Sequence, residues 1–294
     1  MSALQGRKIG FIGLGLMGKP MARNLAKAGA AMIVHNRSQA PVEELAAEGM
    51  APGGSPKGVA AAAEIVICML TDTPAVEKVM LDETDGIIAG ITPETLVIDM
   101  STSKVPATRA IAAAIEAKGG LYVDAPVSGG TIGAEEGTLT IMAGGSDDAF
   151  EKARPLLEVL GKKITHVGGV GTGQVAKAAN QVIVGLNIGA VAEALTLAKH
   201  AGADPARVKE ALGGGFADSR VLEVHGQRMI DDTFVPGARA TVQRKDMDQA
   251  LELAAELGIE LPATALSRDL YDRLIEAGGG DLDHAGLIKA IDPG

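Results

Sequence analysis

The sequence has very few aromatic residues and a single cysteine. Its 294 residues include four Phe, two Tyr and no Trp, although 47% of them are hydrophobic. Aliphatic side chains must therefore fill the interior, and they are sufficient for one large core or two moderate ones. Cys68 cannot form a disulfide within the chain, and its place in the apolar run 65–69 predicts a small buried side chain.

Basic side chains are also scarce. The chain has 27 Lys and Arg against 37 Asp and Glu, a formal charge of −10. Nucleic acids and anionic membranes bind basic surfaces, so neither is the expected partner. The first apolar run, 9–12, is too short for a signal peptide. The longest, 182–197, includes Asn187 and Glu193, which favours a buried helix over a membrane span. We therefore expect a soluble, cytoplasmic protein.

Two kinds of segment alternate between residue 8 and about residue 167. Short β-branched runs predict strands at 8–12, 32–35, 65–69, 96–99, 121–124 and 138–143. Alanine-rich stretches between them predict helices at 17–28, 41–48, 55–63, 74–80 and 106–118. This alternation is typical of a mainly parallel, doubly wound α/β sheet of the Rossmann type. Because the run 65–69 is apolar at every position, helices should cover both faces of that sheet.

The second half of the chain carries no strand pattern. One long helix is expected over 174–201, with Gly202 after its end, and further helices at 205 onward, 219–229, 243–257 and 262–277. We therefore predict a Rossmann domain at 1–168 and an all-helical domain at 169–294, joined by the long helix. Because residues 182–197 are apolar on almost every side, we also expect the helical domain to form a homodimer or homotetramer.

A glycine motif directly follows the first predicted strand and opens the first predicted helix. Its spacing is Gly13-x-Gly15-x-x-Gly18. In a dinucleotide-binding fold, the first glycine allows a tight turn, the second lets the pyrophosphate approach the backbone, and the third packs helix on strand. The helix N-terminus adds amide donors and a partial positive charge. We therefore expect the pyrophosphate on the loop that comprises Gly13, Leu14, Gly15, Leu16, Met17 and Gly18.

The end of the second strand predicts the kind of dinucleotide. An NAD enzyme usually carries an acid about 20 residues after the glycine motif, where it binds the ribose 2′-hydroxyl. This chain has Asn36, Arg37 and Ser38 there instead. The planar guanidinium of Arg37 suits a 2′-phosphate, so NADP is favoured and NAD is the alternative. Met69 and Leu70, at the end of another predicted strand, should border the same cofactor. No metal ion is expected.

A lysine near the start of the long helix is the best candidate for acid–base chemistry. Reduction of a carbonyl by hydride transfer needs a proton donor for the developing alkoxide. Lys177 and Asn180 lie three residues apart among small and apolar side chains, which places them on one helix face. From this segment alone, a lysine that extends to the helix edge is as well supported as one that is buried for catalysis.

Four segments together resemble one enzyme family. They are residues 10–18 (GFIGLGLMG), 124–130 (DAPVSGG), 171–180 (GTGQVAKAAN) and the pair Lys245-Asp246. In order and spacing they resemble the β-hydroxyacid dehydrogenase family, which includes 3-hydroxyisobutyrate dehydrogenase, tartronate semialdehyde reductase and 6-phosphogluconate dehydrogenase. The resemblance covers essentially the whole chain. Within the family, residues 179–188 and 193–198 look most like the tartronate semialdehyde (2-hydroxy-3-oxopropionate) reductases.

The resemblance implies a hydride transfer between NADP(H) and a small 3-hydroxyacid or its semialdehyde. Lys177 would be the general acid/base, and Asn180 would orient the reacting hydroxyl. Substrate-binding donors would come from Ser128, Gly129 and Gly130, and cofactor contacts from Thr102 and from Lys245, the latter brought in by domain closure. The Rossmann domain would bind NADP, and the helical domain would serve substrate binding and oligomerisation.

One position departs from the family pattern. Tartronate semialdehyde reductases usually carry Phe eight residues before the Asp of the Lys-Asp pair, where this chain has Ala238. The pocket should therefore be wider, or closed by Phe216 or Phe234. The favoured activity converts tartronate semialdehyde to D-glycerate; the alternative is a glyoxylate or succinic semialdehyde reductase or a 3-hydroxyisobutyrate dehydrogenase. A non-catalytic, NADP-binding redox sensor is disfavoured, because binding alone needs no proton donor.

Overall fold

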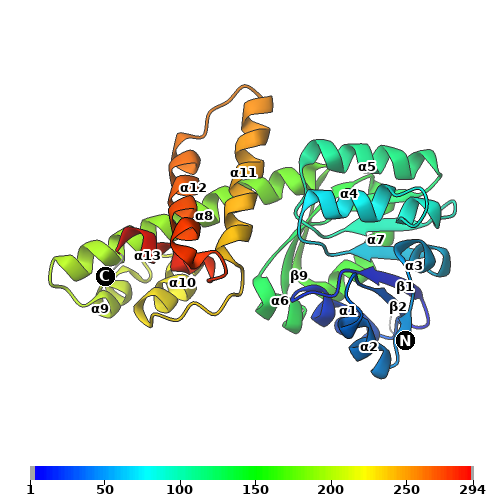
Figure 1. Ribbon diagram of the computed structural model, residues 1–294, viewed down its shortest axis with the longest axis horizontal. Helices are drawn as coiled ribbons and strands as arrows, with labels where there is room; N and C mark the ends of the chain where they lie inside the picture. The colour runs from blue at the N-terminus through cyan, green and yellow to red at the C-terminus, as the bar shows by residue number, and fades with distance from the viewer. Residues whose placement is uncertain (1–3, 293–294) are drawn as a thin grey trace. The chain divides into compact units, whose positions relative to one another are not determined.

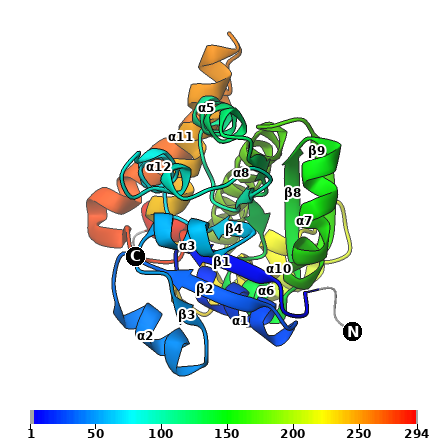
Figure 2. The same cartoon turned by 90° about the vertical axis from the view of Figure 1, so that its right-hand side faces the viewer.

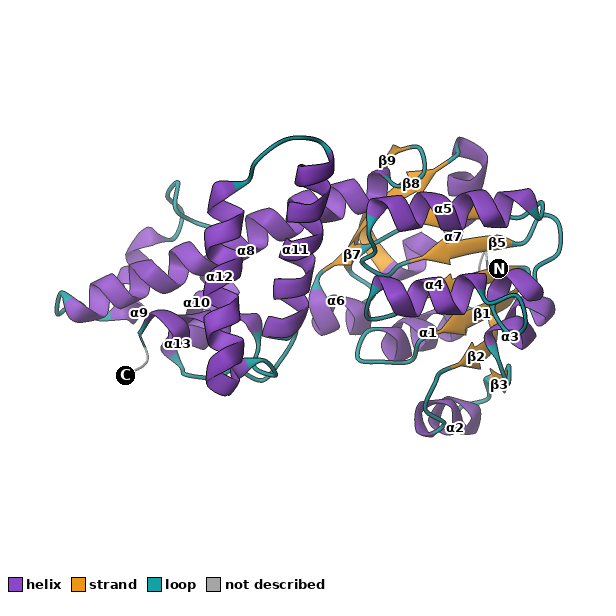
Figure 3. Cartoon of the chain, turned by 45° about the horizontal axis from the view of Figure 1, so that its top comes forward, coloured by secondary structure: helices purple, strands orange, loops and turns teal. Residues whose placement is uncertain are grey.

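The computed structural model describes residues 4–292, which divide into two compact units. The first runs to Lys177 and the second begins at Ala178. The strands all belong to the first unit, whereas the second is built from helices alone in the described residues (Figure 3). The expected architecture, a Rossmann-type domain followed by a helical one, is therefore confirmed.

The first unit contains a sheet of nine strands within residues 4–292, in the order β3-β2-β1-β4-β5-β6-β8-β7, with β9 paired to β8. The strands are β1 (Lys8–Ile12), β2 (Ala31–His35), β3 (Ala51–Pro52), β4 (Ile65–Cys68), β5 (Leu96–Asp99), β6 (Leu121–Asp124), β7 (Val127–Ser128), β8 (Leu139–Gly145) and β9 (Gly161–Gly168). From β3 to β6 every pairing is parallel, and β8 is antiparallel to β6 and β7. The strand order reverses direction between β1 and β4, which is where doubly wound sheets bind their ligands.

Helices cover both faces of this sheet, as the fully apolar β4 predicts. Those of the first unit are α1 (Gly18–Lys27), α2 (Ala40–Ala47), α3 (Pro56–Ala62), α4 (Thr73–Leu81), the 3₁₀ turn η1 (Ile87–Ala89), α5 (Val105–Ala117), α6 (Gly130–Glu136) and α7 (Asp147–Leu160). Several begin at side-chain caps followed by Pro: Ser55 accepts from the Gly58 N–H, and Asp72 from the Ala75 N–H. Figure 1 shows α4 and α5 side by side over one face.

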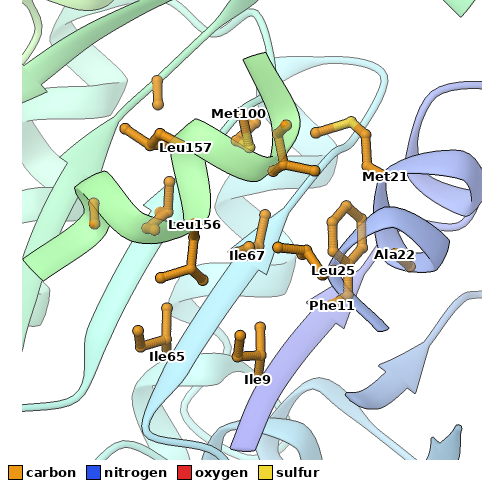
Figure 4. Packing of buried hydrophobic residues seen from close by; sticks show 14 of the residues in the cluster. Ile9, Phe11, Met21, Ala22, Leu25, Ile65, Ile67, Met100, Leu156 and Leu157 are labelled. Atoms are coloured by element: carbon orange, nitrogen blue, oxygen red, sulfur yellow. The ribbon is translucent and has the colours of Figure 1, made fainter. Parts of the chain in front are cut away.

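Alternate strand residues pack into two separate cores. Ile65 and Ile67 of β4 join the core beneath α1 and α7, which Figure 4 shows with Leu25 and Leu156. Val66 and Cys68 belong instead to the core beneath α3, α4 and α5, so Cys68 is buried as predicted. Each buried aliphatic side chain contributes about 1.5–3 kcal/mol. The period-two alternation of β4 thus holds both helical layers on one strand.

The stretch after β6 is more regular than the sequence pattern predicts. It contains β7, α6, α7 and β9, which the apolar patterns do not reveal, beside the expected strand β8. α7 carries Pro155 in its interior, and β9 begins Gly161-Lys162-Lys163, so neither has a continuous apolar signature. β9 lies beside β8 (Figure 2), and its side chains are mostly exposed or half-buried, as an edge strand allows.

The second unit is built around one long helix. α8 (Thr172–His200) begins in the first unit and continues through the second, followed by α9 (Pro205–Leu212), α10 (Arg220–Ile230), α11 (Ala240–Glu256), α12 (Pro262–Leu274), a π-helical turn η2 (Ile275–Gly279), a 3₁₀ turn η3 (His284–Leu287) and α13 (Ile288–Ile291). Ile188 and Leu195 of α8 pack with Leu222, Met247 and Tyr271 from three other helices. These contacts form the core of the unit.

α8 is long and apolar enough to cross a membrane, by length and composition only, and it is the one such helix in the described residues. Ile188, Ala192 and Leu195 are nonetheless buried in the core of the second unit. One side of α8 thus belongs to that core, although only 39% of its apolar window is buried.

Candidate active site

The glycine loop after β1 has the geometry of a close ligand approach. Gly13 has a φ of 97°, and a Cβ atom there would lie 2.2 Å from the backbone oxygen of Met69. A Cβ on Gly18 would lie 1.8 Å from the backbone oxygen of Gly13, so only glycine lets α1 start this close to the loop. At Gly15, by contrast, a Cβ would meet nothing within 4 Å among the described residues beyond its chain neighbours. This open backbone is where the motif brings a pyrophosphate.

Two features adjoin the glycine loop: the N-terminus of α1 and a hydrogen bond from the loop to Asn36. α1 begins without a side-chain cap, because Met17 in the N-cap position accepts no hydrogen bond through its side chain. Such an N-terminus suits a phosphate. The Leu14 N–H donates to Asn36 Oδ1 at 3.0 Å, and Asn36 Nδ2 donates to Ser38 Oγ at 2.8 Å. Asn36 therefore fixes the glycine loop to the end of β2.

Arg37 follows Asn36 at the end of β2, where the sequence predicts the residue that favours NADP over NAD. Arg37 and Ser38 both follow β2 and are exposed, and Leu16 in the loop is 62% exposed. No acidic side chain within residues 4–292 pairs with Arg37. Its guanidinium is therefore available to an anionic group at the carboxyl end of β2.

The ends of β4 and β5 are joined by hydrogen bonds. Met69 and Leu70 are half-buried after β4, and the Leu70 N–H donates to Ser101 Oγ at 2.9 Å. Thr102, the next residue, is half-buried after β5. Since β4 borders β1 at the point where the strand order reverses, these residues lie at the sheet edge that also carries the glycine loop.

A buried polar network connects this edge to α8. Asp99 accepts hydrogen bonds from the Ser101 N–H at 3.0 Å and from Ser103 Oγ at 3.1 Å, and burial raises the pKa of its carboxyl to about 6. Gln174, in the first turn of α8, accepts from the Ser103 N–H at 3.0 Å and donates to the Ser101 carbonyl at 2.8 Å. The loop after β5 is thus fixed to the start of α8.

Asp124 makes a second connection to the same helix. This buried carboxylate at the end of β6 accepts from the Gly171 N–H at 2.7 Å and from the Gln174 N–H at 2.9 Å. Burial raises the pKa of Asp124, while the backbone donors oppose that rise. A carboxylate at a helix N-terminus also stabilises the helix dipole. Asp124 therefore holds the first turn of α8, one turn before Lys177.

Lys177 and Asn180 lie on one face of α8, as the sequence predicts. Lys177 is 7% exposed and is the last residue of the first unit. Asn180, half-buried, follows in the second unit. Lys245 is on α11 in the second unit, 2.9 Å from a carboxylate oxygen of Asp246.

The segment Ser128-Gly129-Gly130 is a junction between a strand and a helix. Ser128 ends β7, and Gly130 is the first residue of α6. Gly129 and Gly130 have φ values of 132° and 61°, which only glycine adopts without strain. Ser128 is half-buried, and the two residues after it are glycines, which carry no side chain that could cover the backbone there.

Three histidine and aspartate side chains in the second unit come within metal-ligand distance of one another: His225, Asp283 and His284. Asp283 already accepts hydrogen bonds from the Arg228 guanidinium and from the Ala285 N–H. Burial raises the pKa of Asp283, but His225, His284 and these donors hold it well below its usual value. The geometry is that of a structural ion pair.

Two family models match consecutive halves of the chain. The NAD binding domain of 6-phosphogluconate dehydrogenase matches residues 8–168, and the NAD-binding region of NADP-dependent 3-hydroxyisobutyrate dehydrogenase matches residues 171–291. The chain belongs to the β-hydroxyacid dehydrogenase family. The glycine motif at 13–18 lies within the region that the first model matches.

Individual relatives in the β-hydroxyacid dehydrogenase family are similar along their whole length. The chain is 49% identical to the 2-hydroxy-3-oxopropionate reductase of Escherichia coli over 97% of each sequence. It is 39% identical to the 2-(hydroxymethyl)glutarate dehydrogenase of Eubacterium barkeri, over 96% of this chain and 94% of that protein. The solved structure of Mycobacterium tuberculosis 3-hydroxyisobutyrate dehydrogenase with L-serine has a TM-score of 0.90 at 32% identity, and the match covers 98% of this chain and 100% of that one.

Family membership confirms part of the functional prediction. The protein is an NAD(P)-dependent β-hydroxyacid dehydrogenase, an oxidoreductase with a small-molecule substrate. This supports the enzyme over the non-catalytic sensor. Asp124, Gln174 and Asp246 all lie in the four segments that resemble the family, but their sequence suggests no particular role for them. Only the fold reveals which groups these side chains contact.

Proposed function

We propose that this enzyme reduces tartronate semialdehyde to D-glycerate with NADPH, with Lys177 as the general acid. The observation that carries the proposal is the buried lysine on α8, one turn after the network of Asp124 and Gln174. The 49% identity to a 2-hydroxy-3-oxopropionate reductase supports this substrate, because 2-hydroxy-3-oxopropionate is another name for tartronate semialdehyde. Glyoxylate, succinic semialdehyde and 3-hydroxyisobutyrate are the alternatives.

In this mechanism the chain orients the aldehyde and supplies a proton. When bound, the nicotinamide supplies the hydride that the carbonyl carbon accepts. Lys177 donates its proton to the carbonyl oxygen, so the product is an alcohol rather than an alkoxide. Asn180, on the same helix face, orients that oxygen. Ser128 and the backbone N–H groups of the glycines after it bind the substrate carboxylate.

The proposed cofactor site is the glycine loop with the strand ends beside it. The open backbone at Gly15 and the uncapped N-terminus of α1 fit a pyrophosphate. Arg37 and Ser38 are exposed beside the loop and would bind the 2′-phosphate of NADP. Residues after β4 and β5 or on α11 would border the nicotinamide half: Met69, Leu70, Thr102 and Lys245.

Ala238 stands where the sequence resemblance leads one to expect the Phe that tartronate semialdehyde reductases usually carry. Phe234 is 8% exposed and belongs to the core of the second unit, whereas Phe216 is fully exposed. Phe234 is therefore committed to the core, which leaves Phe216 as the remaining aromatic candidate. We propose a pocket that accepts tartronate semialdehyde but discriminates weakly against semialdehydes with a longer chain.

We also propose that the enzyme is a homo-oligomer. On α8, Ile183 is 61% exposed and Leu197 is 72% exposed, and Leu266 of α12 is 63% exposed. Large aliphatic side chains this exposed are the kind that a partner subunit covers. A second copy of the chain is the proposed partner, through α8 and α12.

The function is tested by NADPH oxidation with a panel of aldehydes: tartronate semialdehyde, glyoxylate, succinic semialdehyde and methylmalonate semialdehyde. We expect the highest kcat/KM with tartronate semialdehyde. Lys177→Ala should lower kcat about 10²–10⁴-fold while NADPH still binds. Lys199→Ala is the matched control, because Lys199 lies on the same helix with its side chain 58% exposed. A different aldehyde at the head of the ranking would refute the substrate, and near-normal turnover by Lys177→Ala would refute the acid.

A further inference from the structure

A buried carboxylate on α11 is connected to two residues of the proposed site, to one directly and to the other through an amide side chain. Asp246 is 3% exposed. One of its oxygens accepts a hydrogen bond from Gln181 Nε2 at 2.6 Å, and the other lies 2.9 Å from Lys245 Nζ. Gln181 Oε1 in turn accepts from Asn180 Nδ2 at 2.8 Å. Asp246 is therefore connected directly to Lys245 and, through one amide, to Asn180.

The chemistry of this chain of groups gives it a direction. An ionised carboxylate only accepts hydrogen bonds, so Gln181 must turn its NH₂ group toward Asp246. Its carbonyl oxygen must then face Asn180, which has to present its own NH₂ group to Gln181. The oxygen of Asn180 is left to face another partner. The carboxylate thereby removes the ambiguity between the two ends of each amide.

A further contact holds the middle of the chain in place. Gln243, one turn before Asp246 on α11, is 1% exposed, and its Nε2 donates to the backbone carbonyl of Gln181 at 3.0 Å. Gln243 Oε1 lies 3.2 Å from Gln181 Nε2. Both N–H groups of Gln181 therefore point at acceptors on α11. These residues all belong to the second unit.

The geometry points to Asp246 as a positioning residue for the hydride-transfer reaction: through Gln181 it sets the orientation of the Asn180 amide, and by its charge it holds the ammonium of Lys245. The inference rests on the proposed roles of Asn180 and Lys245. Asp246 would thus affect the substrate indirectly, through the side chains of Gln181 and Asn180.

The first test needs neither cofactor nor substrate. In Asp246→Asn the side chain keeps its shape, but its amide can donate as well as accept, so only Gln243 Oε1 still favours one orientation of the Gln181 amide and, through it, of Asn180. We expect the side-chain ¹⁵N amide signals of both residues to move or broaden in NMR spectra of the cofactor-free protein. Asp248→Asn is the matched control: the same change on the same helix, at an acid paired with Arg268, should leave those signals in place.

The second test separates the two connections by steady-state kinetics. Gln181→Leu should lower kcat and raise the KM for the aldehyde, whereas Lys245→Met should raise the KM for the nucleotide. Asp246→Asn should do both, with kcat/KM about 10–100-fold down, since small displacements at a reacting centre have effects of this size. A purely structural role would instead lower Tm and change all constants together.

A triple variant decides between action through these groups and independent action. Added to Gln181→Leu/Lys245→Met, the Asp246→Asn change should alter kcat/KM less than twofold. The inference is overturned if Asp246→Asn lowers kcat/KM by the same factor in the double variant as in the wild type. Unchanged amide signals in Asp246→Asn would overturn it as well. If the wild-type protein turns over no aldehyde of the panel, the proposed substrate class fails, while the amide signals still decide the role of Asp246.

Discussion

Replacement of Asp124 by Ala tests how strongly the first unit holds α8. The carboxylate accepts two backbone hydrogen bonds at the start of the helix, from Gly171 at 2.7 Å and from Gln174 at 2.9 Å. Alanine removes both acceptors from a fully buried position, and the two N–H groups lose their partners. The variant should therefore be destabilised and should also misplace Lys177.

The size of the effect follows from the number and kind of bonds. A hydrogen bond to a charged group contributes about 1.5–3 kcal/mol, so two give about 3–6 kcal/mol. Burial raises the pKa of Asp124, which means that its charge is itself unfavourable in this position. That opposing cost places the expected loss near the lower end, at about 3 kcal/mol of unfolding free energy.

Urea unfolding measures this loss if the two units are observed separately. The chain has two tyrosines and no Trp, and Tyr122 lies in the first unit while Tyr271 lies in the second. In a Tyr271→Phe background, tyrosine fluorescence therefore reports the first unit alone. Asp72→Ala is the matched control, because the half-buried Asp72 caps α4 through a single N–H at 2.9 Å and should lose about 1 kcal/mol.

The comparison of the two variants can refute the reasoning. If Asp124→Ala loses no more stability than Asp72→Ala, the two bonds do not fasten α8. A large loss with normal kcat would show that the anchor stabilises the fold without placing Lys177. We expect instead that kcat falls at urea-free conditions, where the variant is still folded.

Three further results are expected. Arg37→Asp should lower the ratio of NADPH to NADH kcat/KM at least tenfold, whereas Arg207→Asp, an exposed change in the other unit, should leave it unaltered; an unchanged ratio would rule out a phosphate contact. Burial raises the pKa of Asp99 to about 6, so the folded state binds this proton more tightly than the unfolded state and its contribution to stability is lost as pH rises from about 4 to 6. In Asp99→Asn the unfolding free energy should fall about 3 kcal/mol less over this pH range than in the wild type. Urea unfolding at several pH values measures this, and the same pH dependence in both proteins would contradict the prediction. If the proposed homo-oligomer forms through α8, Ile183→Glu should lower the mass measured by light scattering, while Val235→Glu, at a site 82% exposed outside α8, should not; equal masses for both variants would exclude α8 as the interface.

The sheet could be predicted because its strands and helices obey local rules. β4 is apolar at each residue because both of its faces are covered, and the glycine motif falls between β1 and α1. The region from β7 to β9 obeys weaker rules. β9 opens with Gly161-Lys162-Lys163, and its pairing with β8 is fixed by backbone hydrogen bonds that no side-chain pattern reports. Edge strands with mixed burial are therefore the part that the sequence does not reveal.

The glycines of 13–18 are recognisable from their spacing between a strand and a helix. Lys177 becomes recognisable only through the four segments that resemble the family, because its own segment supports an edge lysine equally well. Asp124 and Asp246 are not recognisable, since an aspartate in a sequence is most often exposed, and only the fold shows that each is buried against particular donors. Asn36 was predicted to bind the cofactor, and that remains a proposal; its amide already holds the Leu14 N–H.

The two buried aspartates act on neighbouring parts of one helix. Asp124 fixes α8 at Gln174 through the backbone, and Asp246 contacts it at Gln181 through a side chain. Seven residues, about 10 Å of helix, separate these points, and Lys177 and Asn180 lie between them. Lys177 and Asn180 stand on one continuous helix, so helix geometry sets the spacing between them. In the proposed mechanism, this spacing keeps the proton donor in register with the amide that orients its acceptor.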